Sequence, residues 1–244
     1  MAMKEEFERT GNWLFRWRSY LPLIMLSLFT LALYQYPGGS EYIGHMWEIA
    51  CLFISFVGLA IRIKTIGHTP KGTSGRNTKS HEAHTLNTTG MYSIVRNPLY
   101  LGNYFMGLGL ALFAHLWWLV VIYTLLFWLY YERIIFSEEG FLREKFGQEY
   151  LTWANRTPAM IPKIRRYEKA ELSFSLKNVL KREYNGAFAV VILVFFLDTM
   201  EEYFHAGILT LDKEWLLFVS VFFCIWLTLR SLNRYTRILN VEGR

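Results

Sequence analysis

Five long stretches without a charged residue alternate with polar segments along the chain. These stretches cover residues 19–36, 49–61, 97–131, 184–197 and 215–229. An apolar helix of about 20 residues spans the hydrocarbon core of a bilayer. The middle stretch is too long for one such helix, so we expect two helices that fold back near Ala114 and His115. The pattern predicts an all-α fold, a polytopic membrane bundle of about six transmembrane helices.

The positions of the basic residues give this bundle an orientation. If the N-terminus lies inside, all of the 26 Lys and Arg residues except Lys213 fall on the inner side. This asymmetry is typical of membrane proteins and predicts that both termini are cytoplasmic. A composition that is 53% hydrophobic and 18% aromatic agrees with a membrane protein. The net charge of +6 is then explained by topology and anionic lipids, and no motif indicates a nucleic acid partner.

The same pattern divides the chain into five parts. We expect an interfacial helix over 1–18, two spans over 19–64, a core with an inner loop, a two-helix hairpin and an amphipathic helix over 65–162, a basic cytosolic connector over 163–185, and a two-span hairpin with a tail over 186–244.

The start of the middle apolar stretch is the best candidate for a functional site. Asn97 is a favourable N-cap and Pro98 a favourable first helical residue, so a helix is expected to begin here. Its free N–H groups and positive dipole end would point back into the polar loop. Arg96 lies beside this helix start, and Tyr92 and Tyr100 flank it. The junction therefore offers positive charge, hydrogen-bond donors and aromatic faces at one depth.

The inner loop before this junction has a second polar cluster. Glycines next to hydroxyl, amide and guanidinium groups can surround a phosphate. The residues with such groups are Thr73, Ser74, Arg76 and Asn77. A flexible linker explains the same composition about equally well. His68, His81 and His84 have a spacing that fits no standard metal site, so no metal is predicted.

A pair of acidic residues follows the hairpin. Glu138 and Glu139 precede an amphipathic pattern with an apolar face. That face consists of Leu142, Phe146, Tyr150 and Trp153. Acidic residues also suit the first turn of a helix, which is a purely structural explanation for the pair. By topology, however, both glutamates reach the same inner interface as Arg96.

Together these motifs resemble a known family. Gly-x-Tyr, then Arg-Asn-Pro-x-Tyr-x-Gly, a hairpin, and Glu-Glu-x-x-Leu-x-x-x-Phe-Gly-x-x-Tyr look like the integral-membrane methyltransferases that include isoprenylcysteine carboxyl and phospholipid methyltransferases. The similarity covers about residues 58–162. Most members have His where this chain has Asn97, which removes a titratable ring from the motif.

The resemblance implies S-adenosylmethionine as the cofactor, together with a set of site residues. The implied cofactor-binding residues are Tyr92, Arg96, Asn97, Tyr100, Leu101, Glu138 and Glu139. The predicted catalytic residues are Arg96, Arg76 and Tyr100. From the chemistry of the polar loop, the acceptor is expected to bind at Thr73, Ser74, Arg76 and Asn77. An ionised phosphate or carboxylate oxygen needs no general base, whereas an ammonium must first lose a proton.

Because the motifs contain no obvious base, we favour an anionic acceptor. The chain is also similar to the bacterial lipid A phosphate methyltransferases, which implies a lipid phosphate substrate and a bacterial inner membrane. Carboxyl or amine methylation is an alternative within the same superfamily. An NADPH-dependent protein similar to sterol reductases and a non-catalytic membrane scaffold are alternatives of other classes. The expected partners are the lipid substrate and membrane lipids.

Overall fold

The computed structural model describes residues 2–35, 41–73, 83–209 and 211–244, with side chains from residue 46 onward in the second range. Across these ranges the protein is helical and has no strand, which confirms the predicted fold class. The helices are α1 (Met3–Trp17), α2 (Leu21–Gln35), α3 (Glu41–Gly67), α4 (Met91–Ile94), α5 (Pro98–Phe113), α6 (Trp117–Arg156), the 3-10 helix η1 (Ile164–Arg166), α7 (Leu176–Ala206) and α8 (Lys213–Tyr235).

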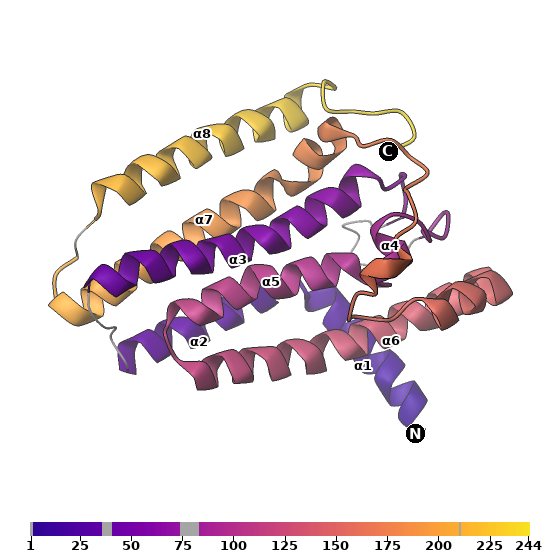
Figure 1. Cartoon of the computed structure of the whole chain (residues 1–244), viewed down its shortest axis with the longest axis horizontal. Helices are drawn as coiled ribbons and strands as arrows, with labels where there is room; N and C mark the ends of the chain where they lie inside the picture. Colours follow the sequence, from indigo (N-terminus) through magenta and orange to yellow (C-terminus); the bar gives the residue numbers. More distant parts are fainter. Residues whose placement is uncertain (1, 36–40, 74–82, 210) are drawn as a thin grey trace.

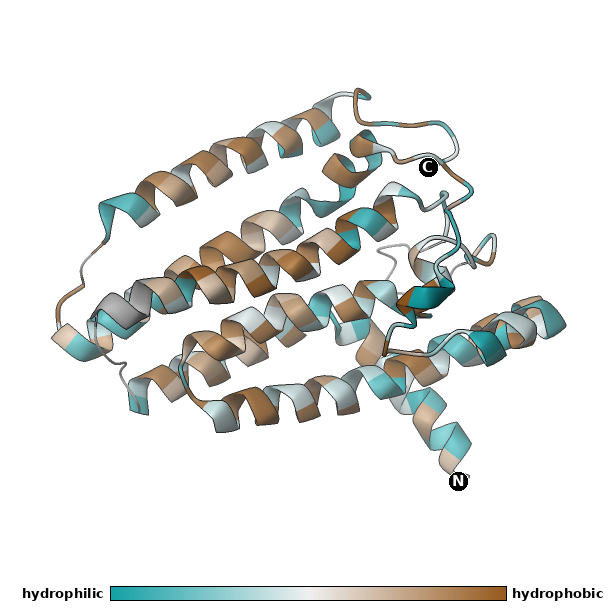
Figure 2. Ribbon diagram, viewed as in Figure 1, coloured by the Kyte–Doolittle hydropathy of each residue, from teal (hydrophilic) through white to brown (hydrophobic). Residues whose placement is uncertain are grey.

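The long helices form a bundle, and the segments around α4 and the C-terminus lie together at one end (Figure 1). Helices α3 and α5 pack closely, α7 lies against α2 and α3, and α8 packs on α7 at the outside. Helix α1 crosses α6 and is bent by 78° from α2. In Figure 2 the apolar residues concentrate along the bundle, while α1 and the last part of α6 are largely hydrophilic.

The predicted helical hairpin is confirmed. Helix α5 ends at Phe113 and α6 begins at Trp117, so the chain folds back at Ala114 and His115. His115 adopts φ 56°, and its ring stacks on Trp47 with 5.2 Å between ring centroids. Burial in this turn lowers the pKa of the His115 imidazole from its usual value. The ring thus contacts the rest of the bundle through its stacking on Trp47.

Fewer helices have the length and hydropathy of a membrane span than the sequence pattern predicts. Among the described residues, only α3 from Met46, α6 and α8 are individually long and apolar enough to cross a membrane, and the bent pair α1–α2 adds a fourth candidate. Helix α5 has 16 residues, which is about 24 Å and short of a bilayer core. These helices make the chain an integral membrane protein, but the expected six spans are not confirmed.

Glycines allow α3 and α5 to approach each other closely. A Cβ atom added at Gly102 would lie 2.8 Å from the carbonyl oxygen of Gly58 and 2.5 Å from Cγ of Arg62. Ser55 Oγ donates a hydrogen bond to the carbonyl oxygen of Met106 at 2.9 Å. Such small residues let the two backbones pack directly against each other, which fixes the position of Arg62 relative to α5.

Replacing Gly102 with alanine is therefore expected to destabilise the bundle, although alanine favours helices. The added methyl group meets backbone and Arg62 atoms, and such overpacking costs about 1–3 kcal/mol. Thermal unfolding of the detergent-solubilised protein should show a lower midpoint. The matched control is Gly140→Ala in α6, where the nearest atom to the new Cβ is 3.8 Å away. Equal midpoints for the two variants would contradict this close packing.

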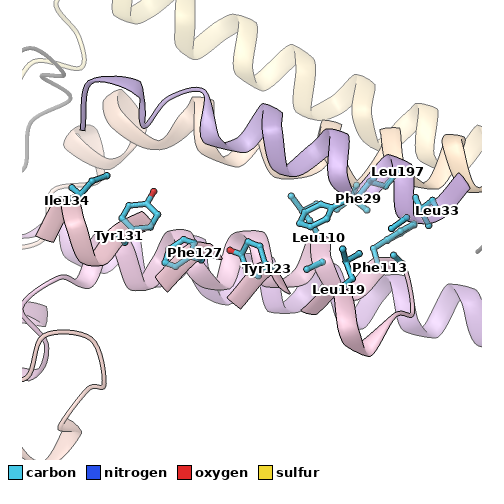
Figure 3. Packing of buried hydrophobic residues seen from close by; sticks show 14 of the residues in the cluster. Phe29, Leu33, Leu110, Phe113, Leu119, Tyr123, Phe127, Tyr131, Ile134 and Leu197 are labelled. Atoms are coloured by element: carbon cyan, nitrogen blue, oxygen red, sulfur yellow. The ribbon is translucent and has the colours of Figure 1, made fainter. Parts of the chain in front are cut away.

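A row of aromatic side chains connects the core to the polar end of the bundle. Tyr123, Phe127 and Tyr131 lie on successive turns of α6, and the rings of Phe127 and Tyr131 have centroids 4.3 Å apart (Figure 3). This four-residue spacing places them on one helix face. Phe29 of α2 and Leu110 of α5 pack against the same core cluster. The row therefore brings Tyr131 to the region where the polar motifs meet.

Candidate active site

The two sequence motifs meet at the polar end of the bundle. Residues 90–97 lie against the segment that follows α6, because the backbone N–H of Arg96 donates to the carbonyl oxygen of Pro158 at 2.8 Å. The backbone N–H of Lys163 likewise donates to the carbonyl oxygen of Ile94 at 2.9 Å. These bonds hold the loop before α5 against the end of α6. As a result, Arg96 and Glu139 form an ion pair with 3.0 Å between Nε and Oε1.

This ion pair is largely buried and has hydrogen-bonding capacity left over. Arg96 Nη1 donates to the carbonyl oxygen of Ala154 at 3.1 Å. Arg96 Nε, Glu139 Oε1 and the Tyr150 hydroxyl are buried without a hydrogen-bond partner among the described residues, since the ion pair lacks hydrogen-bond geometry. Arg96 Nε and Glu139 Oε1 face each other at 3.0 Å, so their charges balance within the protein.

Glu138 precedes Glu139 in α6 and belongs to a separate cluster of polar side chains. The Tyr100 hydroxyl donates to Glu138 Oε1 at 2.9 Å, and Arg18 Nη1 lies 3.9 Å from the same oxygen. The Tyr100 ring packs against Tyr131 with 4.5 Å between centroids. No helix begins at residue 138, because α6 runs through it without a break. The explanation that these acids merely suit a helix start is therefore wrong.

Asn97 occupies the predicted cap position but does not cap the helix with its side chain. Pro98 is at the start of α5, as expected, and Asn97 is its N-cap residue. The Asn97 amide has no capping bond and instead donates to the carbonyl oxygen of Ala159 at 3.1 Å. The expected capping role of this side chain is wrong, because the amide joins the loop to the segment after α6.

A cavity of about 750 Å³ begins at this cluster and extends into the bundle. Its polar end is lined by Arg18, Tyr92, Arg96, Asn97, Tyr100 and Glu138. Its volume lies within the range of about 300–1,000 Å³ that is typical of small-molecule sites. Glu139 does not line the cavity and lies behind Arg96. Arg96 and Glu138 therefore face the same space from two different elements.

The remaining predicted site residues have different surroundings. Thr73 lines the cavity, and its hydroxyl donates to the carbonyl oxygen of Pro70 at 2.9 Å. Leu101 packs against the small cluster of Met91, Ile94 and Val95 and does not line the cavity. Ser74, Arg76 and Asn77 lie outside the described residues.

Sequence reasoning missed a third polar cluster in the cavity wall. Arg62 of α3 donates to Glu183 of α7 through Nε at 2.7 Å and Nη2 at 2.8 Å. Its Nη1 donates to Asn103 Oδ1 at 2.6 Å, and Asn103 Nδ2 donates to the Tyr131 hydroxyl at 3.3 Å. The available signal was an arginine within an apolar helix, since charges in such positions are usually paired or functional. The identity of its partner required the tertiary structure.

The comparisons with known proteins cover the segment that builds most of this site. The phospholipid methyltransferase family matches residues 48–149. The protein-S-isoprenylcysteine O-methyltransferase of Schizosaccharomyces pombe is 30% identical over 86 residues, which cover 35% of this chain and 36% of the relative. The nickel-cobalt-cadmium resistance protein NccN of Alcaligenes xylosoxydans is 32% identical over 150 residues, covering 61% and 63%.

The family match includes the arginine motif, the hairpin and the acidic pair in one continuous segment. Over residues 48–149 the chain is therefore similar to the integral-membrane methyltransferase superfamily. The chain spans about a third of the length of the first relative and nearly two thirds of the second. Helices α7 and α8 follow residue 149 and lie beyond the segment that matches the family. No solved structure matches the chain significantly.

The methyl donor of this superfamily is S-adenosylmethionine, and the polar end of the cavity fits a ligand of this kind. The donor has a sulfonium, an ammonium and a carboxylate. The aromatic faces of Tyr92 and Tyr100 and the Glu138 carboxylate suit its cationic groups, while Arg96 suits its carboxylate.

Proposed function

We propose that the protein transfers a methyl group from S-adenosylmethionine to an ionised oxygen of a lipid-attached acceptor. The observation that carries this proposal is one continuous cavity with Arg96 and Glu138 at its polar end and apolar helix faces at its other end. A water-soluble donor and an apolar acceptor can meet in such a space. Both termini are proposed to be cytoplasmic, so the polar end faces the cytosol.

In this proposal the residues at the polar end bind and orient the donor. Tyr92, Tyr100 and Glu138 would hold its cationic part, and Arg96 its carboxylate, with Glu139 positioning Arg96 from behind. When bound, the donor supplies an activated methyl group: the acceptor oxygen forms the new C–O bond as the C–S bond breaks, and sulfur keeps the electron pair. The protein mainly aligns the two groups and excludes water, which is a large part of the rate enhancement for such transfers.

The proposed charge of the acceptor rests on its chemistry. Four arginines line the cavity, namely Arg18, Arg62, Arg96 and Arg182, and three of them are paired with carboxylates, Arg62 with Glu183, Arg96 with Glu139 and Arg18 with Glu138. A phosphate or carboxylate oxygen is already ionised at neutral pH and needs no base. We propose a lipid phosphate, as in a glycolipid such as lipid A, as the acceptor. The relatives named isoprenylcysteine O-methyltransferases favour a prenylated carboxylate as the second candidate.

The test is to incubate membranes that contain the protein with methyl-tritiated donor. We expect label in the lipid extract, and the Tyr100→Phe variant should transfer less because it loses the hydrogen bond to Glu138. A methyl ester of a carboxylate releases methanol in mild base, whereas a methyl phosphate ester is stable there, so base treatment separates the two acceptors. Binding of NADPH without binding of S-adenosylhomocysteine would contradict the proposal and favour a reductase.

A further inference from the structure

The inner part of the cavity is closed by helices outside the matched family segment. Beyond Asn103 its wall becomes apolar, with contributions from α2, α5, α6 and α7. These residues include Phe29, Met106, Leu110, Phe127, Val190 and Leu193. Helices α5 and α6 belong to the segment 48–149, whereas α2 and α7 do not. This apolar part is called the inner chamber below.

The inner chamber is elongated along the helices. From Asn97 to Leu110 the cavity follows α5 for about 20 Å, at the rise of about 1.5 Å per helical residue. On α7 the lining residues run from Arg182 to Leu193. A space that is polar at one end and apolar along the rest has the shape and polarity of a lipid with a headgroup and a chain.

The boundary between the polar end and the inner chamber consists of the Arg62–Glu183 pair. Both oxygens of Glu183 accept from Arg62, and a third Arg62 nitrogen donates to Asn103. The guanidinium charge is thus neutralised and three of its N–H groups are satisfied within the wall. A hydrocarbon chain can pass a closed ion pair at far lower cost than an isolated charge.

Small residues on α7 leave the chamber open. Gly186 and Ala189 both line the cavity. A Cβ atom added at Gly186 would make only ordinary contacts, 3.5 Å from Glu183 Oε2 and 3.7 Å from Cε of Met106. Both neighbours of this Cβ atom are side-chain atoms of residues that line the cavity, so a larger side chain at position 186 is expected to occupy part of the chamber. A substitution at Gly186 can therefore fill the inner chamber without changing a residue at the polar end of the cavity.

We infer that α7 completes a binding site for the hydrocarbon chain of the acceptor, with Gly186 and Ala189 setting the room for that chain. This inference rests on the proposed function, and it assigns chain selectivity to a helix outside the methyltransferase family segment. The chamber walls contact the chain, while the polar end holds the headgroup and the donor. Acceptor recognition and donor binding are then separable by substitution.

The experiment uses the full chain in phosphatidylcholine vesicles and a dodecyl phosphate with a diazirine at the end of the alkyl chain. After irradiation, mass spectrometry should find the label on inner-chamber residues such as Met106 and Leu193. Gly186→Leu should lower this labelling by about tenfold, equivalent to ~1.4 kcal/mol of lost binding. The matched control is Ala187→Leu, a neighbouring α7 position that does not line the cavity.

Binding of S-adenosylhomocysteine is measured in parallel and should be the same in wild type, Gly186→Leu and Ala187→Leu. Equal labelling of the chamber in both leucine variants, or label confined to the exposed face of α8, would overturn the inference. If Gly186→Leu loses S-adenosylhomocysteine binding, Ala189→Leu replaces it as the test variant. Failure of the wild type to bind S-adenosylhomocysteine would instead contradict the proposed function and leave the chain labelling as an independent result.

Discussion

Replacing Arg96 with alanine should weaken binding of S-adenosylhomocysteine by about ten- to one hundredfold. Arg96 lines the cavity, and a hydrogen bond to a charged group contributes about 1.5–3 kcal/mol. Glu139→Ala should cause a similar loss although Glu139 does not line the cavity, because it holds the Arg96 guanidinium at 3.0 Å. Isothermal titration calorimetry on the purified protein measures both effects.

The double variant decides whether Glu139 acts through Arg96. Residues that act as one unit are strongly non-additive, so the Arg96→Ala, Glu139→Ala protein should bind little worse than either single variant. Arg165→Ala, which removes an equal charge from an exposed position of η1, should bind like the wild type. Additive losses would show that Glu139 contacts the ligand directly and that the geometry of the pair has been misinterpreted.

Replacing Glu183 with alanine should destabilise the protein by about 3–5 kcal/mol, because it leaves the Arg62 guanidinium without its partner. The pair joins α3 to α7, and the Glu183 side chain is only 4% exposed. Unfolding of the detergent-solubilised protein, followed by circular dichroism, measures the change. Glu171→Ala, at an exposed position before α7, is the matched control and should have no effect.

A second variant separates charge pairing from simple loss of packing. Replacing both partners, as Arg62→Met with Glu183→Leu, removes the ion pair and leaves no unpaired charge. Such replacements of buried ion pairs are often neutral or stabilising. The double variant should therefore recover most of the stability that Glu183→Ala loses. A double variant as unstable as the single one would indicate that the pair contributes through side-chain volume and not through charge.

The sequence predicted those features that depend on neighbouring residues or on the order of the membrane spans. Uninterrupted apolar residues indicated the hairpin, and the His115 turn lies where the run of 97–131 had to fold back. Pro98 and Asn97 located the start of α5 for the same reason, because cap preferences depend on neighbouring residues only. The meeting of Arg96 with the acidic pair followed from topology, which orders the segments on one side of the membrane.

The features that the sequence could not provide depend on distant partners. The Arg62–Glu183 pair joins residues 121 positions apart, and neither residue belongs to a recognisable motif. The N-cap geometry of Asn97 was also beyond reach, since the carbonyl of Ala159 competes for its amide. The run 184–197 also did not give the bounds of α7, because the helix continues through the charged residues at both ends.

Helix α6 passes from the aromatic row to the acidic pair without interruption, and its first non-helical residue is Gly147. The angular relation between Tyr131 and the two glutamates is therefore set by the helical repeat alone. One inserted residue in this interval would turn Glu138 and Glu139 by about 100° around the axis and move them ~1.5 Å along it. Glu139 would then swing away from Arg96, and Glu138 away from Tyr100. The number of residues between Tyr131 and Glu138 therefore determines whether the two glutamates face their partners. A change in the length of the polar loop or of the tail would not restore their orientation.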